Sequence, residues 1–108
     1  SYKSSYEYWT DEIDKAESQN EKDDDSQKRY EVMDECLNYI WNLIKNDTDE
    51  TTYQKILEEQ RTWIADKEAK AKAASDEYGD GSSGTAAYYD KAAELTMTRC
   101  EELIEYLK

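Results

Sequence analysis

The sequence contains no proline, no histidine and no phenylalanine, and it has only three glycines and two cysteines. The absence of proline removes the commonest helix breaker, and because the glycines all fall in the stretch 79–84, helices can run through most of the remaining chain. Without histidine the chain cannot build a Ser-His-Asp or Cys-His catalytic arrangement. Two cysteines are too few for a structural zinc site, which needs four nitrogen or sulfur ligands. We therefore predict that the chain is not an enzyme and that it binds no metal and no cofactor.

Long apolar segments are also missing. No hydrophobic run approaches the roughly 20 residues that a transmembrane helix needs, so we expect no transmembrane segment. The first residues do not resemble a signal peptide. Because such a leader is often removed, this does not assign the chain to the cytoplasm.

The sequence is rich in acidic residues. Its 27 Asp and Glu residues outnumber 14 Lys and Arg residues, which gives a net charge of −13. A surface this negative repels nucleic acid and anionic lipid and speeds the encounter with cationic proteins. We therefore expect no nucleic-acid partner and favour a cationic one.

Apolar residues recur at steps of three and four along nearly the whole chain, which is typical of amphipathic helices. We predict an all-α fold, a three- to four-helix, mostly antiparallel bundle that forms one domain over residues 1–108. The helices are expected at about 4–21, 27–45, 50–78 and 86–107, with a loop at 79–85.

Polar residues predict where these helices begin. Three adjacent acids, Asp23–Asp25, indicate a solvated turn, after which Ser26 can cap the second helix. Thr51 and Gln54 fit a capping box at the start of the third helix. Thr85 is the predicted cap of the fourth.

The two cysteines, Cys36 and Cys100, fall on or beside the apolar stripes of the second and fourth helices. A disulfide between them would close a loop of about 64 residues, worth about 4 kcal/mol in the chain-entropy model. The alternative is two buried thiols that pack as small hydrophobes. We favour the disulfide, because single cysteines on two facing helices are typical of a domain that a disulfide cross-links in an oxidising compartment.

Two polar residues interrupt the predicted core. Gln60 lies in an apolar stripe, where its amide needs hydrogen-bond partners. Arg99 lies on the inner half of the fourth helix, and we expect it to pair with a carboxylate such as Asp34 or Glu68. Both residues are interpreted as structural rather than catalytic.

One stretch matches the spacing of a calcium-binding EF-hand loop, with Asp47, Asp49, Thr51, Tyr53 and Glu58 at the ligand positions. The sixth position holds Thr52 where that loop requires glycine, and the loop would displace the start of the third helix. We interpret the match as a coincidence in an acidic chain.

Three segments resemble one known family. Residues 34–41 (DECLNYIW) are similar to its D-x-x-L-N-x-x-Y helix, and residues 60–68 (QRTWIADKE) to its Q-x-x-W-x-x-x-R-D segment. Residues 94–103 (ELTMTRCEEL) are similar to its closing L-T-x-x-R-x-x-E-L helix. The family is the lysozyme-inhibitor LprI type, N-terminal domain. The positions that match its motifs are Asp34, Leu37, Asn38, Trp41, Gln60, Trp63, Lys67, Glu68 and Arg99.

The resemblance implies an all-helical bacterial envelope domain, secreted or lipid-anchored, that inhibits lysozyme by binding it. It also implies that the motif positions chiefly hold the helices together. Many relatives carry a further cysteine after the Trp63 segment, where this chain has Ala69–Ala71. The disulfide pattern of the family therefore does not transfer to Cys36 and Cys100.

Three functional hypotheses follow. The first is a secreted or surface-anchored protein that binds lysozyme or another cationic protein, with Asp80, Ser82 and Ser83 of the glycine-rich loop as candidate contacts. The second is a structural or interaction module of the envelope without lysozyme activity. The third, a cell-wall hydrolase, would need two carboxylates facing each other in a cleft.

Overall fold

The computed structural model describes residues 2–78 and 82–107. It contains four helices: α1 (Tyr2–Lys15), α2 (Gln19–Asp47), α3 (Glu50–Asp76) and α4 (Ser82–Glu105). Within this part of the chain no residue is in a β-strand. The prediction of an all-α bundle is confirmed.

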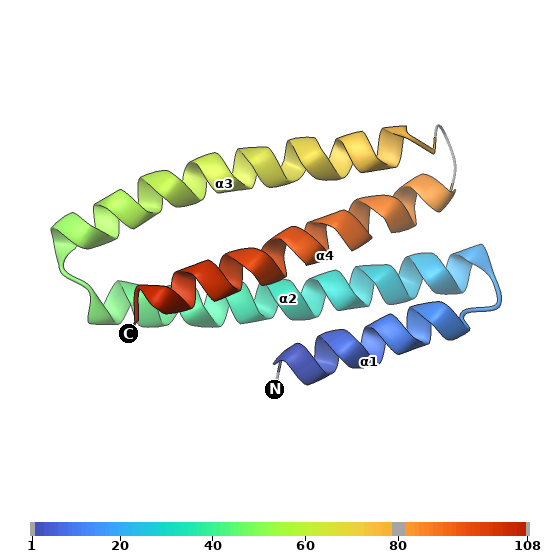
Figure 1. Cartoon of the computed structure of the whole chain (residues 1–108), viewed down its shortest axis with the longest axis horizontal. Coiled ribbons are helices and arrows are strands. Elements are labelled where there is room, and N and C mark those ends of the chain that lie inside the picture. Colours follow the sequence, from blue (N-terminus) through green and yellow to red (C-terminus); the bar gives the residue numbers. More distant parts are fainter. Residues whose placement is uncertain (1, 79–81, 108) are drawn as a thin grey trace.

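The four helices lie nearly in one layer. Figure 1 shows the order α3, α4, α2, α1 across the molecule, and successive helices run antiparallel. The layer measures 48 × 28 × 14 Å, and its radius of gyration of 15.2 Å exceeds the roughly 13 Å of a compact domain of about 100 residues. The α2–α4 interface is the most extensive, and α4 fills the space between the arms of the α2–α3 hairpin. A layer this thin leaves many side chains half-buried at its two faces.

The main apolar cluster lies where α2, α3 and α4 converge. Its buried members are Leu37, Ile40, Ile44, Ile56, Cys100 and Leu103, and the half-buried Cys36, Trp41, Tyr53, Trp63 and Leu107 pack against them. Toward the other end of α4, Ala86, Ala92 and Ala93 are buried. Their small side chains let α4 approach its neighbours closely.

Helix α2 begins earlier than predicted, and Ser26 is not its cap. The N-cap is Ser18, whose Oγ accepts the Glu21 N–H at 3.1 Å, while the Glu21 carboxylate accepts the Glu17 N–H at 3.1 Å. This reciprocal pair satisfies two otherwise unpaired donors. Ser26 is fully buried in the body of α2.

The three acids Asp23–Asp25 lie within α2 and do not form a turn. Helical spacing gives two of them partners, since Gln19 Nε2 donates to Asp23 at 2.8 Å and Lys28 Nζ lies 2.9 Å from Asp24. Negative charge near a helix N-terminus is also stabilised by the helix dipole. Local pairing therefore outweighs the low helix propensity of aspartate.

Helix α3 is capped by Asp49 rather than by Thr51. The Asp49 carboxylate accepts the Thr52 N–H at 2.8 Å, and Thr51 already lies inside the helix. Gln54 donates to the Glu50 side chain at 2.9 Å. The positions that match an EF-hand therefore lie mainly on a continuous helix.

We expect Asp49→Ala to lower the melting temperature at neutral pH, because the Thr52 N–H loses its acceptor. This hydrogen bond also holds the pKa of Asp49 below its ordinary value of 3.8. The stabilisation is then complete above the unfolded-state pKa and is lost as the pH falls through the lower folded-state pKa. The difference in melting temperature should shrink on acidification to about pH 2.

Asp49→Asn is the matched control, since it keeps an acceptor oxygen without a titrating group. It should retain most of the cap and lose this pH dependence. A melting difference between wild type and Asp49→Ala that is identical at neutral and acid pH would contradict the assignment.

Helix α4 starts at Ser82, so the predicted loop 79–85 ends earlier than expected. Thr85 lies inside the helix and does not cap it. Of the candidate contact residues, Ser82 and Ser83 belong to the first turn of α4, and Asp80 lies outside the described residues.

The first helix packs against α2 through Ile13 and a buried arginine. Arg29 of α2 donates to Thr10 Oγ1 of α1 at 2.8 Å and to Asp90 Oδ1 of α4 at 2.9 Å, and its guanidinium lies 4.8 Å from the centre of the Tyr6 ring. One side chain thus ties three helices together. Across the described residues, the helices are too polar or too short for a membrane span.

Candidate functional site

An open groove runs between α2 and α3. Its volume is about 300 Å³, which is enough to receive one or two side chains of a partner. It is lined by Asp34, Leu37, Asn38 and Trp41 of α2 and by Leu57, Gln60, Trp63, Ile64 and Lys67 of α3. We call it the α2–α3 groove.

Helical spacing explains why these residues share one surface. Positions 34, 37, 38 and 41 lie on one face of α2, and positions 57, 60, 64 and 67 on one face of α3. Because α4 fills the space between the two arms, these two faces do not close on each other. Ile64 remains 41% exposed, so part of this apolar surface is available to a partner.

Lys67 forms one end of the groove and is held in place. Its Nζ donates to the Tyr30 hydroxyl at 2.9 Å and lies 5.2 Å from the centres of both the Tyr30 and the Trp63 rings. The two aromatic faces attract the ammonium group. This contact links α3 to α2 and fixes the Trp63 ring beside the groove.

A buried polar pair supports the α3 wall from behind. Arg99 of α4 donates from Nε to Gln60 Oε1 at 2.8 Å, and both residues are nearly inaccessible, at 7% and 6% exposure. The other guanidinium nitrogens lie 3.4 Å from Glu102 and 3.8 Å from Glu59. Arg99 therefore pairs with carboxylates, but the named partners Asp34 and Glu68 are wrong, because Glu102 lies one helical turn from Arg99 and Glu59 is the neighbour of Gln60 on α3.

The network ends at Tyr106 near the end of the described chain. The Tyr106 hydroxyl donates to Glu59 Oε1 at 2.5 Å. This bond to a carboxylate is the main cause that raises the pKa of Tyr106 above its ordinary value. Glu59 therefore connects two groups of the C-terminal segment to α3.

The structure brings together most of the motif positions singled out from the sequence. Seven of the nine line the groove, namely Asp34, Leu37, Asn38, Trp41, Gln60, Trp63 and Lys67. Arg99 contacts one of them, and Glu68 lies exposed on α3. Gln60 and Arg99 bond to each other and Lys67 bonds to Tyr30, whereas Asn38, Trp41 and Trp63 line the groove with polar and aromatic surface. Leu57 and Ile64 also line it and follow from helical spacing alone.

The two cysteines are neighbours in the α2–α4 interface. Both are free thiols in this structure, with Cys36 half-buried and Cys100 buried. The predicted proximity of the two helices is present, and the disulfide between them stays a prediction.

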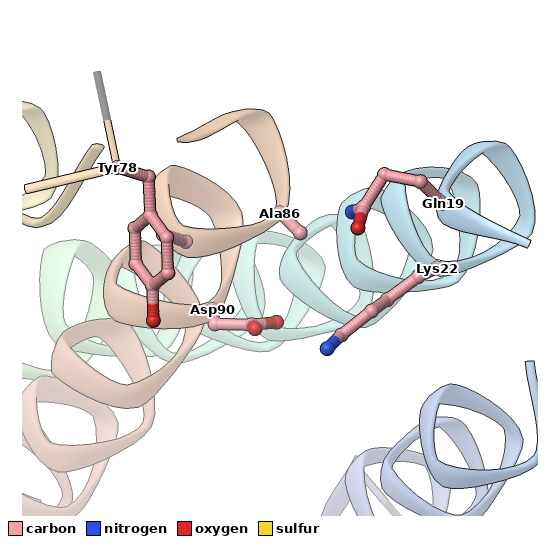
Figure 2. A pocket seen from close by; sticks show the side chains of 6 residues that line it. Gln19, Lys22, Tyr78, Ala86 and Asp90 are labelled. Carbon is pink, nitrogen blue, oxygen red and sulfur yellow. The ribbon is translucent and has the colours of Figure 1, made fainter. Parts of the chain in front are cut away.

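A second, smaller hollow lies at the opposite end of α4. Its volume is about 90 Å³, and Gln19, Lys22, Tyr78, Ala86, Ala87 and Asp90 line it. Figure 2 shows Lys22 and Asp90 beside it, with the Tyr78 ring at its edge. Asp90 is already bound to Arg29, and this hollow is smaller than the α2–α3 groove.

Acidic side chains are numerous on the surface of this bundle. The described residues contain no cluster of three or more Cys, Asp or Glu side chains arranged to hold a metal ion. The single carboxylate that lines the α2–α3 groove, Asp34, does not supply the pair that a glycosidase requires.

One comparison with known proteins identifies a family. Residues 10–103 match the family model described as lysozyme inhibitor LprI. No curated protein and no solved structure matches the chain. The matched region contains α2, α3, the C-terminal part of α1 and most of α4, and it includes both walls of the groove.

Proposed function

The chain belongs to the lysozyme inhibitor LprI family, and on this premise we propose that it is a binding protein of the bacterial envelope that inhibits lysozyme by protein–protein contact. The observation that supports this proposal most directly is the placement of seven family-motif positions around one open groove. Leu37 and Gln60 are buried in the groove walls, whereas the other five positions keep part of their surface accessible.

The side chains of the groove suit a protein partner. Trp41 and Trp63 offer large aromatic surfaces that are only half-buried, and aromatic side chains in central pockets contribute much of the binding energy at interfaces. Asp34 and Asn38 add a carboxylate and an amide at the edge. We infer that an apolar or aromatic side chain of lysozyme enters the groove.

The charge of the chain supports a cationic partner. The net charge of −13 raises the rate of encounter with a basic protein, and this effect weakens as salt screens the charges. The surface charge would steer lysozyme to the domain, and the groove would hold it.

We further propose that the protein acts outside the cytoplasm, secreted or lipid-anchored, because lysozyme meets bacteria at the cell envelope. This placement rests on family membership. In either location, secreted or lipid-anchored, the groove would be accessible to soluble lysozyme.

A second candidate function is an envelope interaction module that has no effect on lysozyme. Three tyrosines favour it, because Tyr8, Tyr39 and Tyr78 are 54%, 56% and 63% exposed. They belong to different parts of the fold, whereas the groove gathers its aromatic groups at one place. The inhibitor therefore remains the better-supported candidate.

The test is the rate at which lysozyme degrades a cell-wall substrate, measured with increasing amounts of this protein at low and high salt. We expect dose-dependent inhibition that weakens by about tenfold or more between ~50 and ~200 mM salt, because charge-steered association is salt-sensitive. An unrelated helical protein of similar net charge is the control for non-specific sequestration. If a large molar excess leaves the rate unchanged at both salt concentrations, the inhibitor function is rejected and the interaction module is retained.

A further inference from the structure

Two cysteines separated by most of the chain meet at the α2–α4 interface. Cys100 is 4% exposed, and its sulfur lies 4.0 Å from the Met33 carbonyl oxygen of α2. Cys36 follows Met33 by three residues, and a helical side chain lies over the turn that precedes it. Cys36 packs against the apolar cluster that contains Cys100.

We propose that Cys36 and Cys100 are an oxidisable pair that closes into an intramolecular disulfide in an oxidising compartment and thereby cross-links α2 to α4. Two observations carry this inference: the Cys100 sulfur lies beside the α2 turn that precedes Cys36, and Cys36 packs against the cluster that contains Cys100, at the most extensive helix interface. It does not depend on lysozyme being the partner.

The reaction requires an oxidant, which we identify by class as another disulfide, either a small molecule or an oxidoreductase. The Cys36 thiolate attacks one sulfur of that disulfide, so a mixed disulfide forms and one thiolate leaves. Cys100 then loses its proton and attacks the Cys36 sulfur, which releases the second thiolate. In total the two protein thiols lose two protons and two electrons, and the oxidant is reduced to two thiols.

Exposure determines which thiol reacts first. Cys36 is half-buried and can be reached from solvent, whereas Cys100 is enclosed in the core. Burial above all, together with the neighbouring Cys36 and the Asp34 and Glu101 carboxylates, raises the pKa of Cys100 far above its ordinary value. Cys100 is therefore a poor nucleophile toward external reagents and acts as the resolving thiol once Cys36 carries a leaving group.

The cross-link would stabilise the part of the fold on which the groove depends. It closes a loop of about 64 residues that contains all of α3, which restricts the unfolded chain. It also fixes α2 against α4 beside Leu37, which belongs to the groove wall. Oxidation would thus secure the spacing of the groove walls.

The test uses the reduced chain in buffers of reduced and oxidised glutathione at several ratios. Free thiols are trapped with iodoacetamide, and peptide mass spectrometry locates the alkylated, glutathionylated and linked cysteines. Thermal unfolding of the same samples gives the melting temperature. We expect both free thiols to disappear together and a disulfide-linked pair of peptides that contain residues 36 and 100 to form. The melting temperature should rise by an amount on the order of 10 °C.

Two variants report on the order of the steps. Cys100→Ser should accumulate a stable glutathione adduct on Cys36, and Cys36→Ser should leave Cys100 unmodified in the folded protein. A lasting adduct on Cys36 of the wild type, disulfide-linked dimers, or two free thiols at every ratio would overturn the proposal. These readouts involve no lysozyme, so the failure of either proposal is distinguishable from the failure of the other.

Discussion

Replacing Trp63 with alanine is expected to weaken lysozyme inhibition by about 30-fold or more. Trp63 lines the α2–α3 groove, and Lys67 holds its ring in place. Truncating an aromatic side chain at the centre of an interface typically costs at least about 2 kcal/mol of binding free energy, which corresponds to about 30-fold in affinity. The measurement is the concentration of protein that halves the lysozyme rate.

The chain provides a matched control in Trp9, which lies on α1 and contacts Tyr8 and Lys28. Trp9→Ala removes the same side chain at a site outside the groove and should leave inhibition nearly unchanged. Equal losses of inhibition for Trp9→Ala and Trp63→Ala would exclude the groove as the contact.

Trp63 also packs against the apolar cluster, so its removal reduces stability as well as binding. Ile64→Gln separates the two effects, because Ile64 lines the same groove but is 41% exposed, and glutamine is a good helix former. We expect this variant to keep its melting temperature within a few degrees and to inhibit less. A folded Ile64→Gln variant with wild-type inhibition would count against an apolar contact at this position.

The second large effect concerns the buried arginine. Arg99→Ala is expected to lower the free energy of unfolding by about 3 kcal/mol, because it leaves the buried Gln60 oxygen without a donor and opens a cavity. The two carboxylates near Arg99 are 37% and 56% exposed, so they stay hydrated and add less to the loss. Chemical denaturation followed by circular dichroism measures the change.

Arg61 supplies the control on the same bundle. Its side chain is 65% exposed and pairs only locally with Glu58 at 2.9 Å, so Arg61→Ala should change stability by less than about 1 kcal/mol. Arg99→Lys keeps the positive charge but lacks the planar guanidinium group. It should therefore lose less of the free energy of unfolding than Arg99→Ala does. If Arg99→Ala and Arg61→Ala are equally stable, the buried network does not support the groove wall.

The start of α2 shows what a closer examination of the sequence could have found. Ser18 and Glu21 fit the Ser-x-x-Glu capping box, but three consecutive aspartates a few residues later suggested a turn instead. Propensity scales treat each aspartate alone, whereas Gln19 and Lys28 provide partners one turn away. The start of α2 at Ser18 was therefore predictable from its local capping box.

The partners of Arg99 illustrate a different limit. Its burial was predicted from its place on the inner half of a helix, but the choice among many carboxylates was not. Glu102 follows from its position three residues after Arg99 on the same helix, but the choice of Gln60 and Glu59 depends on the rotation of α3 and α4 about their axes. Side-chain spacing within one helix contains no information on this rotation.

The sequence by itself determined the helical fold, the acidic surface and the family, because helical periodicity, charge and motif spacing are local properties of the chain. Only the tertiary structure decided that seven motif positions from two segments border one groove and that Cys36 meets Cys100. The physical reason is the position of α4, which packs between the arms of the α2–α3 hairpin and keeps two facing helix surfaces apart.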